Sequence, residues 1–199
     1  ERLVLEAARE LNSESAGNFM VVRFGNVLGS RGSILPLFQQ QIEKGGPLTI
    51  THAGMKRWFM TIPEACSLVL KAGGVGDNGT LYLLDMGEPI RIKDMAEQMV
   101  RFYGYEPDID IKIETIGLRP GERLDESLWS DDETPCGTKF NKILKVERKL
   151  HTPQAELDVH TLIEKLRPVC CFDAARPHVY RDSSLLRTIL AEALPQRAD

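Results

Sequence analysis

The sequence lacks the features that would mark a membrane-spanning, secreted or nucleic-acid-binding protein. No apolar run reaches the roughly 18 residues that a transmembrane helix requires. The first residues contain no basic segment followed by a long apolar run, so we expect no signal peptide. Acidic residues number 29 and basic residues 25, which leaves no bulk positive charge to hold nucleic acid. With 42% hydrophobic and 27% charged residues, the composition is typical of a soluble globular protein.

Sequence patterns that bind metal ions are absent. The four cysteines include no C-x-x-C pair, and the four histidines lack the spacing of metal ligands. We therefore expect no metal site. The adjacent residues Cys170 and Cys171 could be oxidised, but free thiols in a reducing cytoplasm are the simpler expectation.

The motifs of a complete dinucleotide-dependent enzyme are also missing. No G-x-x-G-x-x-G or G-x-G-x-x-G run follows a predicted strand, so the cofactor fingerprint is absent. No Tyr-x-x-x-Lys occurs, and no Ser, His and Asp lie in a recognisable catalytic motif. We assign no catalytic residue within the chain. Because Glu1 opens inside a helical pattern, we expect the chain to be a fragment of a longer protein.

Strand-like and helix-like segments alternate between residues 18 and 116, which indicates an α/β architecture. Apolar runs predict strands at 18–24, 47–51, 80–84 and 110–116, the first and third of them parallel. Helical spacing and capping signals predict helices over 1–12, from Ser33 to Gly45, from Thr61 to Gly73, and over 92–103, 153–166 and 182–194. The glycine-rich run 25–33 and the acidic run 130–137 are predicted to be loops.

Several cationic side chains accompany glycine-rich turns. Glycine lets backbone N–H groups approach a phosphate, and arginine binds phosphate oxygens with a two-pronged fork. The start of a helix adds the positive end of a dipole. The pattern indicates an anion site, although for each arginine taken singly a solvated surface position is the preferred interpretation. Trp58 and Phe59 are interpreted first as core aromatics. The cations are Arg23, Arg31, Lys56, Arg57, Arg119 and Arg123.

Four segments carry a resemblance to a known family. They read RFGNVLGSRGS (23–33), PLTIT (47–51), MKRWFMTIPEA (55–65) and LRPGERL (118–124). In order and spacing they resemble the CapD-like polysaccharide-biosynthesis branch of the extended short-chain dehydrogenase/reductases, which includes UDP-N-acetylglucosamine 4,6-dehydratases. The resemblance covers roughly residues 1–150. It implies an α/β fold made of the C-terminal part of an NAD(P)-binding Rossmann fold and a small α/β substrate-binding lobe.

The resemblance also implies a division of the chain. Residues 1–32 and about 75–90 would be the remnant of the Rossmann domain, residues 33–74 and 91–150 the nucleotide-sugar-binding lobe, and residues 151–199 a C-terminal helical extension. The catalytic lysine motif, the acid/base residues and the cofactor loop would lie upstream of Glu1. NAD or NADP would therefore be a cofactor of the full-length enzyme, with none bound to this chain alone.

Site roles follow from the same resemblance. Two arginines would clamp the pyrophosphate of a UDP-sugar, a carboxylate would bind the ribose hydroxyls, an amide would reach a phosphate, and two strand residues would present their backbone to uracil. In that order, these positions are Arg57 and Arg119, Glu122, Asn26, and Thr49 with Ile50. The positions expected beside the nicotinamide are Phe24, Gly25 and Asn26.

The implied reaction is a dehydration of the sugar. Bound NAD(P)+ would oxidise the C4 hydroxyl to a ketone, water would leave across C5–C6, and the hydride would return to C6. The alternatives are an epimerase or reductase with the same binding half, or a non-catalytic module that binds a nucleotide sugar or a partner protein. We expect a UDP-sugar as ligand, no nucleic acid, a cytoplasmic location, and a full-length parent that is homo-oligomeric and membrane-anchored through an upstream segment.

Overall fold

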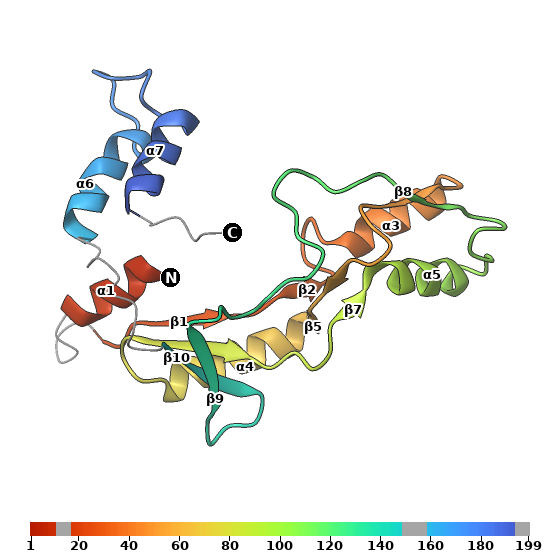
Figure 1. Cartoon of the computed structure of the whole chain (residues 1–199), viewed down its shortest axis with the longest axis horizontal. Coiled ribbons are helices and arrows are strands. Elements are labelled where there is room, and N and C mark those ends of the chain that lie inside the picture. Colours follow the sequence, from red (N-terminus) through yellow and green to blue (C-terminus); the bar gives the residue numbers. More distant parts are fainter. Residues whose placement is uncertain (11–16, 149–158, 194–199) are drawn as a thin grey trace. The chain divides into compact units, whose positions relative to one another are not determined.

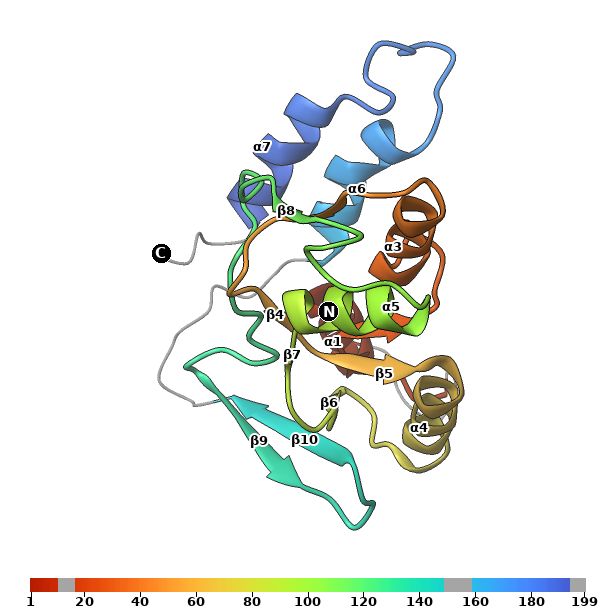
Figure 2. The same cartoon turned by 90° about the vertical axis from the view of Figure 1, so that its right-hand side faces the viewer.

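The computed structural model describes residues 1–10, 17–148 and 159–193, and Figures 1 and 2 show it from two directions. The described residues form two compact units. One contains residues 1–10, 17–19, 77–79 and 159–193, and the other contains residues 20–76 and 80–148. No helix in these ranges is long and apolar enough to cross a bilayer.

A four-stranded sheet is the centre of the larger unit. Strands β1 (Met20–Arg23) and β6 (Thr80–Leu84) are parallel, which confirms the predicted pair. Strand β6 also pairs antiparallel with β10 (Ile143–Arg148), which in turn pairs with β9 (Glu133–Gly137). All five residues of β6 are buried, and this strand has a neighbour on each edge. The hydrophobic run 81–84 is typical of a strand with both faces covered.

The β9–β10 hairpin shows that the loop predicted for residues 130–137 is wrong in its second half. The segment contains Pro135 and Gly137, which have low strand propensity, so no local signal marks it as a strand. Pairing overrides that propensity: Pro135 lies opposite Val146, and Gly137 lies opposite Leu144. The hairpin is drawn in teal in Figure 2.

Helix α4 (Ile62–Val75) packs against this sheet through Ala65, Leu68 and Ala72. Its predicted start is confirmed, because the Thr61 hydroxyl accepts a hydrogen bond from the Glu64 N–H. Its predicted stop at Gly73 and Gly74 falls one residue short, since the helix runs on to Val75.

The chain turns at the next residue, Gly76, where the packing leaves no room for a side chain. A Cβ on Gly76 would lie 2.5 Å from the Met20 sulfur and 2.6 Å from the Ala72 carbonyl oxygen. The run 73–79 also contains the spacing G-x-G-x-x-G. It begins in the last turn of α4 and leads into strand β6, the reverse of the strand–turn–helix order that cradles a dinucleotide. It is therefore not a cofactor fingerprint.

A second hydrophobic cluster lies in the same unit. Helices α3 (Ile34–Glu43) and α5 (Ile92–Phe102) pack with the parallel strands β3 (Leu48–Ile50) and β8 (Ile113–Thr115). These strands confirm the predictions for 47–51 and 110–116. Helix α3 begins after Ser33 as predicted, and Gly45, with a φ of 85°, follows its end. The buried side chains at the centre are Phe38, Ile42, Leu48, Ile50, Met55, Phe59, Ile92, Ala96, Val100 and Ile111.

Two short strand pairs connect the clusters. Strand β2 (Asn26–Leu28) runs parallel to β5 (Phe59–Thr61), and β4 (Lys56–Arg57) runs antiparallel to β7 (Ile90–Arg91). Strand β2 corrects the prediction that residues 25–33 are a loop throughout. Only the second part turns, at Gly29 and Gly32, whose φ angles of 75° and 80° favour glycine.

The smaller unit is helical. It contains α1 (Arg2–Glu10), α6 (Val159–Cys170) and α7 (Ser183–Ala193), which share a core of Leu162, Val169 and Ile189. Helix α1 confirms the predicted first helix, and α7 confirms the last. Helix α6 extends past its predicted end at 166, to Cys170. The predicted positions 11–12, 153–158 and 194 lie outside the described residues.

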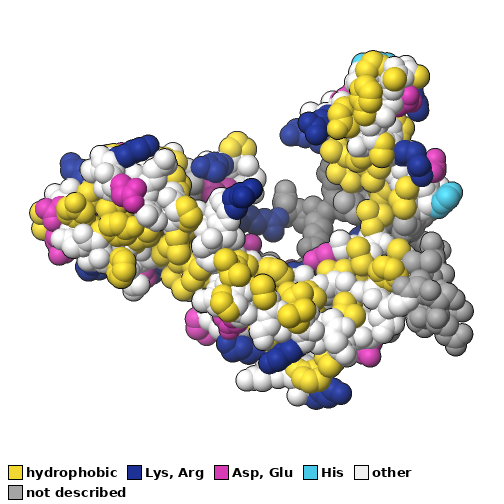
Figure 3. Space-filling model, turned by 180° about the vertical axis from the view of Figure 1, so that it is seen from behind, with side chains coloured by type: hydrophobic (Ala, Val, Ile, Leu, Met, Phe, Trp, Pro, Cys, Tyr) yellow, Lys and Arg dark blue, Asp and Glu magenta, His cyan; other side chains and the backbone are white. Residues whose placement is uncertain are grey.

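Hydrophobic side chains remain visible on the molecular surface shown in Figure 3. The most exposed large ones in the larger unit are Phe102 at 87%, Ile109 at 78% and Leu70 at 76%. Strand β1 also has only β6 as a neighbour in the described part of the sheet. Exposed apolar side chains and an open strand edge are surfaces against which further polypeptide can pack.

Candidate functional site

A cavity of about 460 Å³ opens within the larger unit, between β2, β3, the start of α3 and the loop after β8. That volume lies in the usual range for small-molecule sites, roughly 300–1,000 Å³. The cavity gathers segments nearly a hundred residues apart, and all six positions expected to contact a UDP-sugar lie on its wall. They are Asn26, Thr49, Ile50, Arg57, Arg119 and Glu122.

Arg57 is largely committed to the protein itself. Its Nη1 donates to the carbonyl oxygens of Lys56 and Leu124 at 2.8 and 3.0 Å, and its Nη2 donates to that of Arg123 at 2.8 Å. The guanidinium has five N–H groups, so at most two remain for a ligand. Arg57 therefore fastens the 119–124 loop to strand β4 as well as facing the cavity.

Arg119 differs from Arg57 in having an uncommitted side chain. Its backbone N–H donates to Glu122 at 3.1 Å, and its carbonyl accepts the Glu122 N–H. No partner for its guanidinium occurs within residues 1–10, 17–148 and 159–193. Of the two cavity arginines, Arg119 can therefore offer a bidentate fork to a phosphate without breaking an existing contact.

Glu122 is oriented by its neighbours. Its Oε2 accepts the Arg119 N–H, and its Oε1 accepts the Thr51 hydroxyl at 3.3 Å and lies 4.0 Å from the Arg57 guanidinium. A carboxylate can accept about four hydrogen bonds, so lone pairs of Glu122 remain for hydroxyl donors of a ligand. Thr51, which sequence reasoning did not single out, thereby lies on the cavity wall and positions this carboxylate.

Asn26 is less available than its predicted role requires. Its Nδ2 donates to the Trp58 carbonyl and to Glu126 Oε2, both at 3.2 Å. The Trp58 indole N–H in turn donates to the Glu126 carbonyl at 2.9 Å. Both side-chain N–H groups of Asn26 are therefore used, and a phosphate would have to replace the exposed Glu126 carboxylate.

Thr49 and Ile50 lie in β3, and the Gln41 side chain on α3 forms hydrogen bonds to this strand. The Ile50 carbonyl accepts the Ile116 N–H at 2.9 Å, so it is engaged by the segment after β8. The Thr49 N–H donates to Oε1 of Gln41 at 3.1 Å, and Nε2 of Gln41 donates to the Thr49 hydroxyl at 2.8 Å. Sequence reasoning missed Gln41, because a glutamine on a helix surface carries no local signal of such a contact.

The start of α3 also faces the cavity. Ser30, Gly32 and Ser33 lie on its wall, and the helix that follows Ser33 has ten residues. Ser33 caps the helix without a side-chain bond, and its buried hydroxyl has no partner in the described structure. A helix start favours negative charge through its N–H groups and dipole. The positive end of this helix dipole, predicted to help bind an anion, therefore faces the same cavity as Arg57 and Arg119.

Phe24 and Gly25, assigned beside a nicotinamide, do not line this cavity, whereas Asn26 does. Gly25 lies in a close contact: its N–H points at the Met86 sulfur at 2.9 Å. A Cβ at Gly25 would be 2.8 Å from the Trp58 Cβ and 3.0 Å from the Trp58 carbonyl oxygen. The glycine is thus required by packing, independently of any cofactor.

We expect Gly25→Ala to lower the free energy of unfolding by about 1–3 kcal/mol, because the methyl group forces the Trp58 backbone to move. Gly137→Ala is the matched control, since a Cβ there meets nothing within 4 Å and the φ angle is not positive. That control should change stability by no more than about 0.5 kcal/mol. Chemical denaturation of both variants tests this, and equal midpoints would contradict the packing argument.

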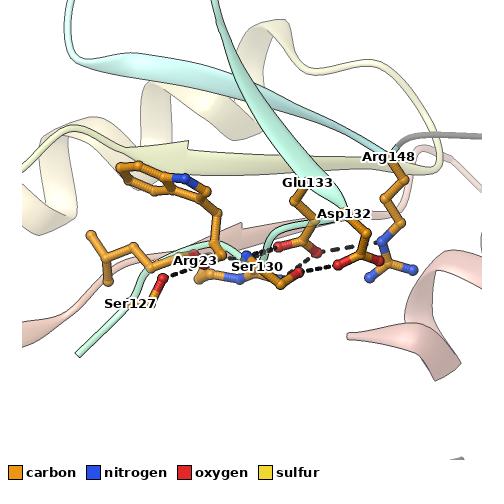
Figure 4. A network of polar contacts seen from close by, with 8 residues as sticks. Arg23, Ser127, Ser130, Asp132, Glu133 and Arg148 are labelled. Carbon is orange, nitrogen blue, oxygen red and sulfur yellow. Dashed lines mark hydrogen bonds and ion pairs between the residues drawn. The ribbon is translucent and has the colours of Figure 1, made fainter. Parts of the chain in front are cut away.

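Four of the cations noted in the sequence do not line the cavity: Arg23, Arg31, Lys56 and Arg123. Arg23 points instead to Glu133, with Nη1–Oε2 and Nη2–Oε1 distances of 2.7 and 3.2 Å (Figure 4). Its assignment to an anion-binding cluster is therefore wrong. Because residues 130–137 are predicted to be a loop, the sequence offers no reason to pair Arg23 with Glu133.

The carboxylate of Glu133 is buried and fully engaged. Besides Arg23 it accepts the Ser130 N–H at 3.1 Å and lies 3.4 Å from Arg148 Nε (Figure 4). Burial alone would raise the pKa of Glu133, but the hydrogen bonds from Arg23 and Ser130 and the positive charge of Arg23 lower it to about 2. This network joins β1 to the hairpin and has no contact with the cavity wall, so its role is structural.

In the part of the chain that the structure covers, no three His, Cys, Asp or Glu residues are grouped as metal ligands. The four cysteines are free thiols.

Comparison with known proteins agrees with these observations. The sequence profile of a family described as polysaccharide biosynthesis protein matches residues 1–148. The capsular polysaccharide biosynthesis protein CapD of Staphylococcus aureus is 47% identical over 163 residues, which are 81% of this chain and 26% of CapD. A UDP-glucose 4-epimerase of Rickettsia bellii is 35% identical over 133 residues, 67% of this chain and 37% of the epimerase.

Solved structures give the same architecture. Pen from Bacillus thuringiensis superposes with a TM-score of 0.63 at 34% identity, over 78% of this chain and 46% of Pen. DesIV, a dTDP-glucose 4,6-dehydratase from Streptomyces venezuelae with NAD and TYD bound, superposes with a TM-score of 0.50 at 18% identity, over 62% of this chain and 39% of DesIV. The chain thus spans about a quarter of CapD and less than half of either structural neighbour.

Proposed function

Because the chain belongs to the polysaccharide biosynthesis protein family, of the CapD-like type, we propose that it forms the substrate-binding portion of a UDP-hexose 4,6-dehydratase. The α/β fold, with parallel strand pairs and Rossmann-type structural neighbours, is that of the sugar-nucleotide dehydratases and epimerases. UDP-N-acetylglucosamine is the proposed substrate, and capsule or O-antigen synthesis the proposed process.

The cavity carries this proposal. The uncommitted guanidinium of Arg119 and the start of α3 meet in it, and they suit a diphosphate. Glu122 suits ribose hydroxyls, and aliphatic side chains from α3, α5 and the loop after β8 suit a flat uncharged base. A nucleotide sugar contains these three parts joined in a row.

The cofactor is proposed to be NAD or NADP, held mainly by polypeptide other than this chain. The described residues contain no strand–turn–helix glycine loop, and only Phe24, Gly25 and Asn26 are proposed to lie beside the nicotinamide. When bound, the cofactor would accept a hydride from the sugar. The residues of this chain would bind and orient the substrate, which can contribute several kcal/mol to lowering the barrier.

The proposed division of the chain follows the same scheme. Residues 1–32 and about 75–90 would complete the Rossmann domain, residues 33–74 and 91–150 would form the nucleotide-sugar lobe, and residues 151–199 would be an appended helical segment. The open edge of β1 and the exposed apolar side chains are available to pack against the rest of a longer, homo-oligomeric and cytoplasmic enzyme.

The purified chain is expected to show no turnover of UDP-N-acetylglucosamine in the presence of NAD+, because it contains neither a cofactor fingerprint nor a Tyr-x-x-x-Lys motif. Product analysis by mass spectrometry checks this, since dehydration removes one water from the sugar. A chain extended upstream to include both motifs should restore the reaction. Turnover by the chain above that of a boiled sample would contradict the proposal.

A 4-epimerase is the second candidate, favoured by the 35% identity to the Rickettsia bellii UDP-glucose 4-epimerase. Epimerisation leaves the mass of the sugar unchanged and inverts C4, whereas dehydration gives a 4-keto sugar with a methyl group at C6. The same product analysis on the extended enzyme therefore separates the two candidates.

A further inference from the structure

Gln41 does not line the cavity, but its side chain forms two hydrogen bonds to Thr49, which does. By helical spacing it continues the face of α3 on which Ile34 and Leu37 line the cavity. Its side-chain amide bonds both the backbone N–H and the hydroxyl of Thr49. Thr49 lines the cavity and Gln41 does not, so Gln41 can influence a ligand only through Thr49.

The direction of the two hydrogen bonds follows from the backbone. A backbone N–H can only donate, so the carbonyl oxygen of Gln41 must face it, and the NH₂ group must face the Thr49 hydroxyl. That hydroxyl therefore accepts from Gln41 and keeps its own proton for another acceptor. Within the described residues the Thr49 hydroxyl has no acceptor for this proton.

The strand geometry explains why a side chain makes these contacts. Among the described residues, strand β3 pairs only with β8, through groups that include the Leu48 N–H and the Ile50 carbonyl. The Thr49 backbone faces the opposite, open edge, where the Gln41 amide takes the place of a neighbouring strand. The contact thus fixes Thr49 at the point where the strand meets the cavity.

We infer that Gln41 is a positioning residue that keeps the Thr49 hydroxyl as a hydrogen-bond donor to the C4 carbonyl of a uracil base. The inference rests on the proposed function, because it assumes a nucleotide in the cavity. Aliphatic residues near Thr49, among them Leu37 and Ile50, provide the uncharged surroundings that a base requires. C4 is the base carbonyl farther from the ribose, and cytosine carries an amine there.

The replacement Gln41→Glu tests the direction of the hydrogen bond between the Gln41 side chain and the Thr49 hydroxyl. A glutamate can still accept the Thr49 N–H, but its second oxygen can only accept, so the Thr49 hydroxyl must turn its proton toward it. The ratio of UDP to CDP affinity should then fall about tenfold, because one hydrogen bond to the C4 oxygen is lost. The added negative charge weakens both nucleotides alike, so it cancels in the ratio.

Two substitutions at Thr49 complete the experiment. Thr49→Val removes the hydroxyl, keeps the backbone bond to Gln41, and should lower the ratio as Gln41→Glu does. Thr49→Ser keeps the hydroxyl and should retain the ratio of the parent. Calorimetric titration of the chain with UDP and CDP measures all four proteins, and thermal unfolding shows whether each is folded.

The outcomes separate the inference from the function on which it rests. A parent ratio retained in both Gln41→Glu and Thr49→Val overturns the inference and leaves the proposed function standing. Equal weakening of UDP and CDP with a lower melting temperature would show a merely structural glutamine and also overturn it. If the parent binds neither nucleotide, the proposed function itself fails, and the inference fails with it.

Discussion

Replacing Glu133 by glutamine is expected to lower the free energy of unfolding by about 3 kcal/mol at neutral pH. The Glu133 side chain is 1% exposed and pairs with Arg23 at 2.7 Å, so glutamine leaves the Arg23 guanidinium without its buried counter-charge. Breaking a buried ion pair from one side typically costs about 3–5 kcal/mol. Glutamine retains one acceptor oxygen, which places the expected loss at the lower end. Chemical denaturation monitored by circular dichroism measures it.

The effect should depend on pH in a definite direction. The pKa of Glu133 falls from an ordinary 4.5 to about 2 in the folded protein, so its carboxylate stabilises the fold above pH 4.5. That contribution is lost as the pH falls from about 4.5 to about 2, where the folded-state carboxylate takes up a proton. The parent should therefore lose stability more steeply than Glu133→Gln across this window.

Glu147→Gln is the matched control, because Glu147 is an exposed carboxylate on the adjacent strand β10. It should change the free energy of unfolding by no more than about 0.5 kcal/mol and leave the pH dependence as in the parent. Equal stability losses in the two variants, or parallel pH profiles for the parent and Glu133→Gln, would show that the buried network does not stabilise the fold.

Replacing Arg119 by alanine should weaken UDP binding to the chain by roughly ten- to a hundredfold. A well-formed charge-assisted hydrogen bond contributes about 1.5–3 kcal/mol, and about 1.4 kcal/mol is a factor of ten. The Arg119 guanidinium has no protein partner in the described structure, so its removal should leave the melting temperature unchanged. Arg119→Lys should recover only part of the affinity, because lysine lacks the bidentate fork.

Arg57→Ala should weaken UDP binding to a similar extent but also lower the melting temperature. The three carbonyl groups that Arg57 bonds would lose their donor, and the 119–124 loop would loosen. Both variants should bind with a weaker dependence on salt, since one charge contact is lost. A lower melting temperature in Arg57→Ala but not in Arg119→Ala would show that Arg57 also holds the 119–124 loop, whereas the Arg119 guanidinium is free to bind the ligand.

Arg31→Ala controls for the change in net charge. Arg31 lies in the adjacent turn, between Ser30 and Gly32, but does not line the cavity. Its replacement should alter UDP affinity by no more than about twofold. If Arg119→Ala and Arg57→Ala bind UDP as the parent does, neither arginine is a phosphate ligand, and the site assignment fails.

The elements that could be predicted from the sequence are those whose cause is local. The apolar run of β6 marks a strand, and Thr61 with Glu64 marks the start of α4. The apolar run and the capping pair each lie within a few consecutive residues, so a single sequence shows them. The six positions expected to contact a nucleotide sugar came from the resemblance of motifs, and the structure places all of them around one cavity.

The tertiary structure alone decided which polar groups meet. Arg23 and Glu133 are 110 residues apart, and pairing with β10 turns an acidic segment of low strand propensity into the strand that carries Glu133. Arg57 bonds backbone carbonyls 66 and 67 residues away, which no motif specifies. Gln41 and Thr49 are only eight residues apart, yet they meet because α3 packs beside the open edge of β3. A hydrogen bond depends on position and direction to within a few tenths of an ångström, and only the packed chain supplies both.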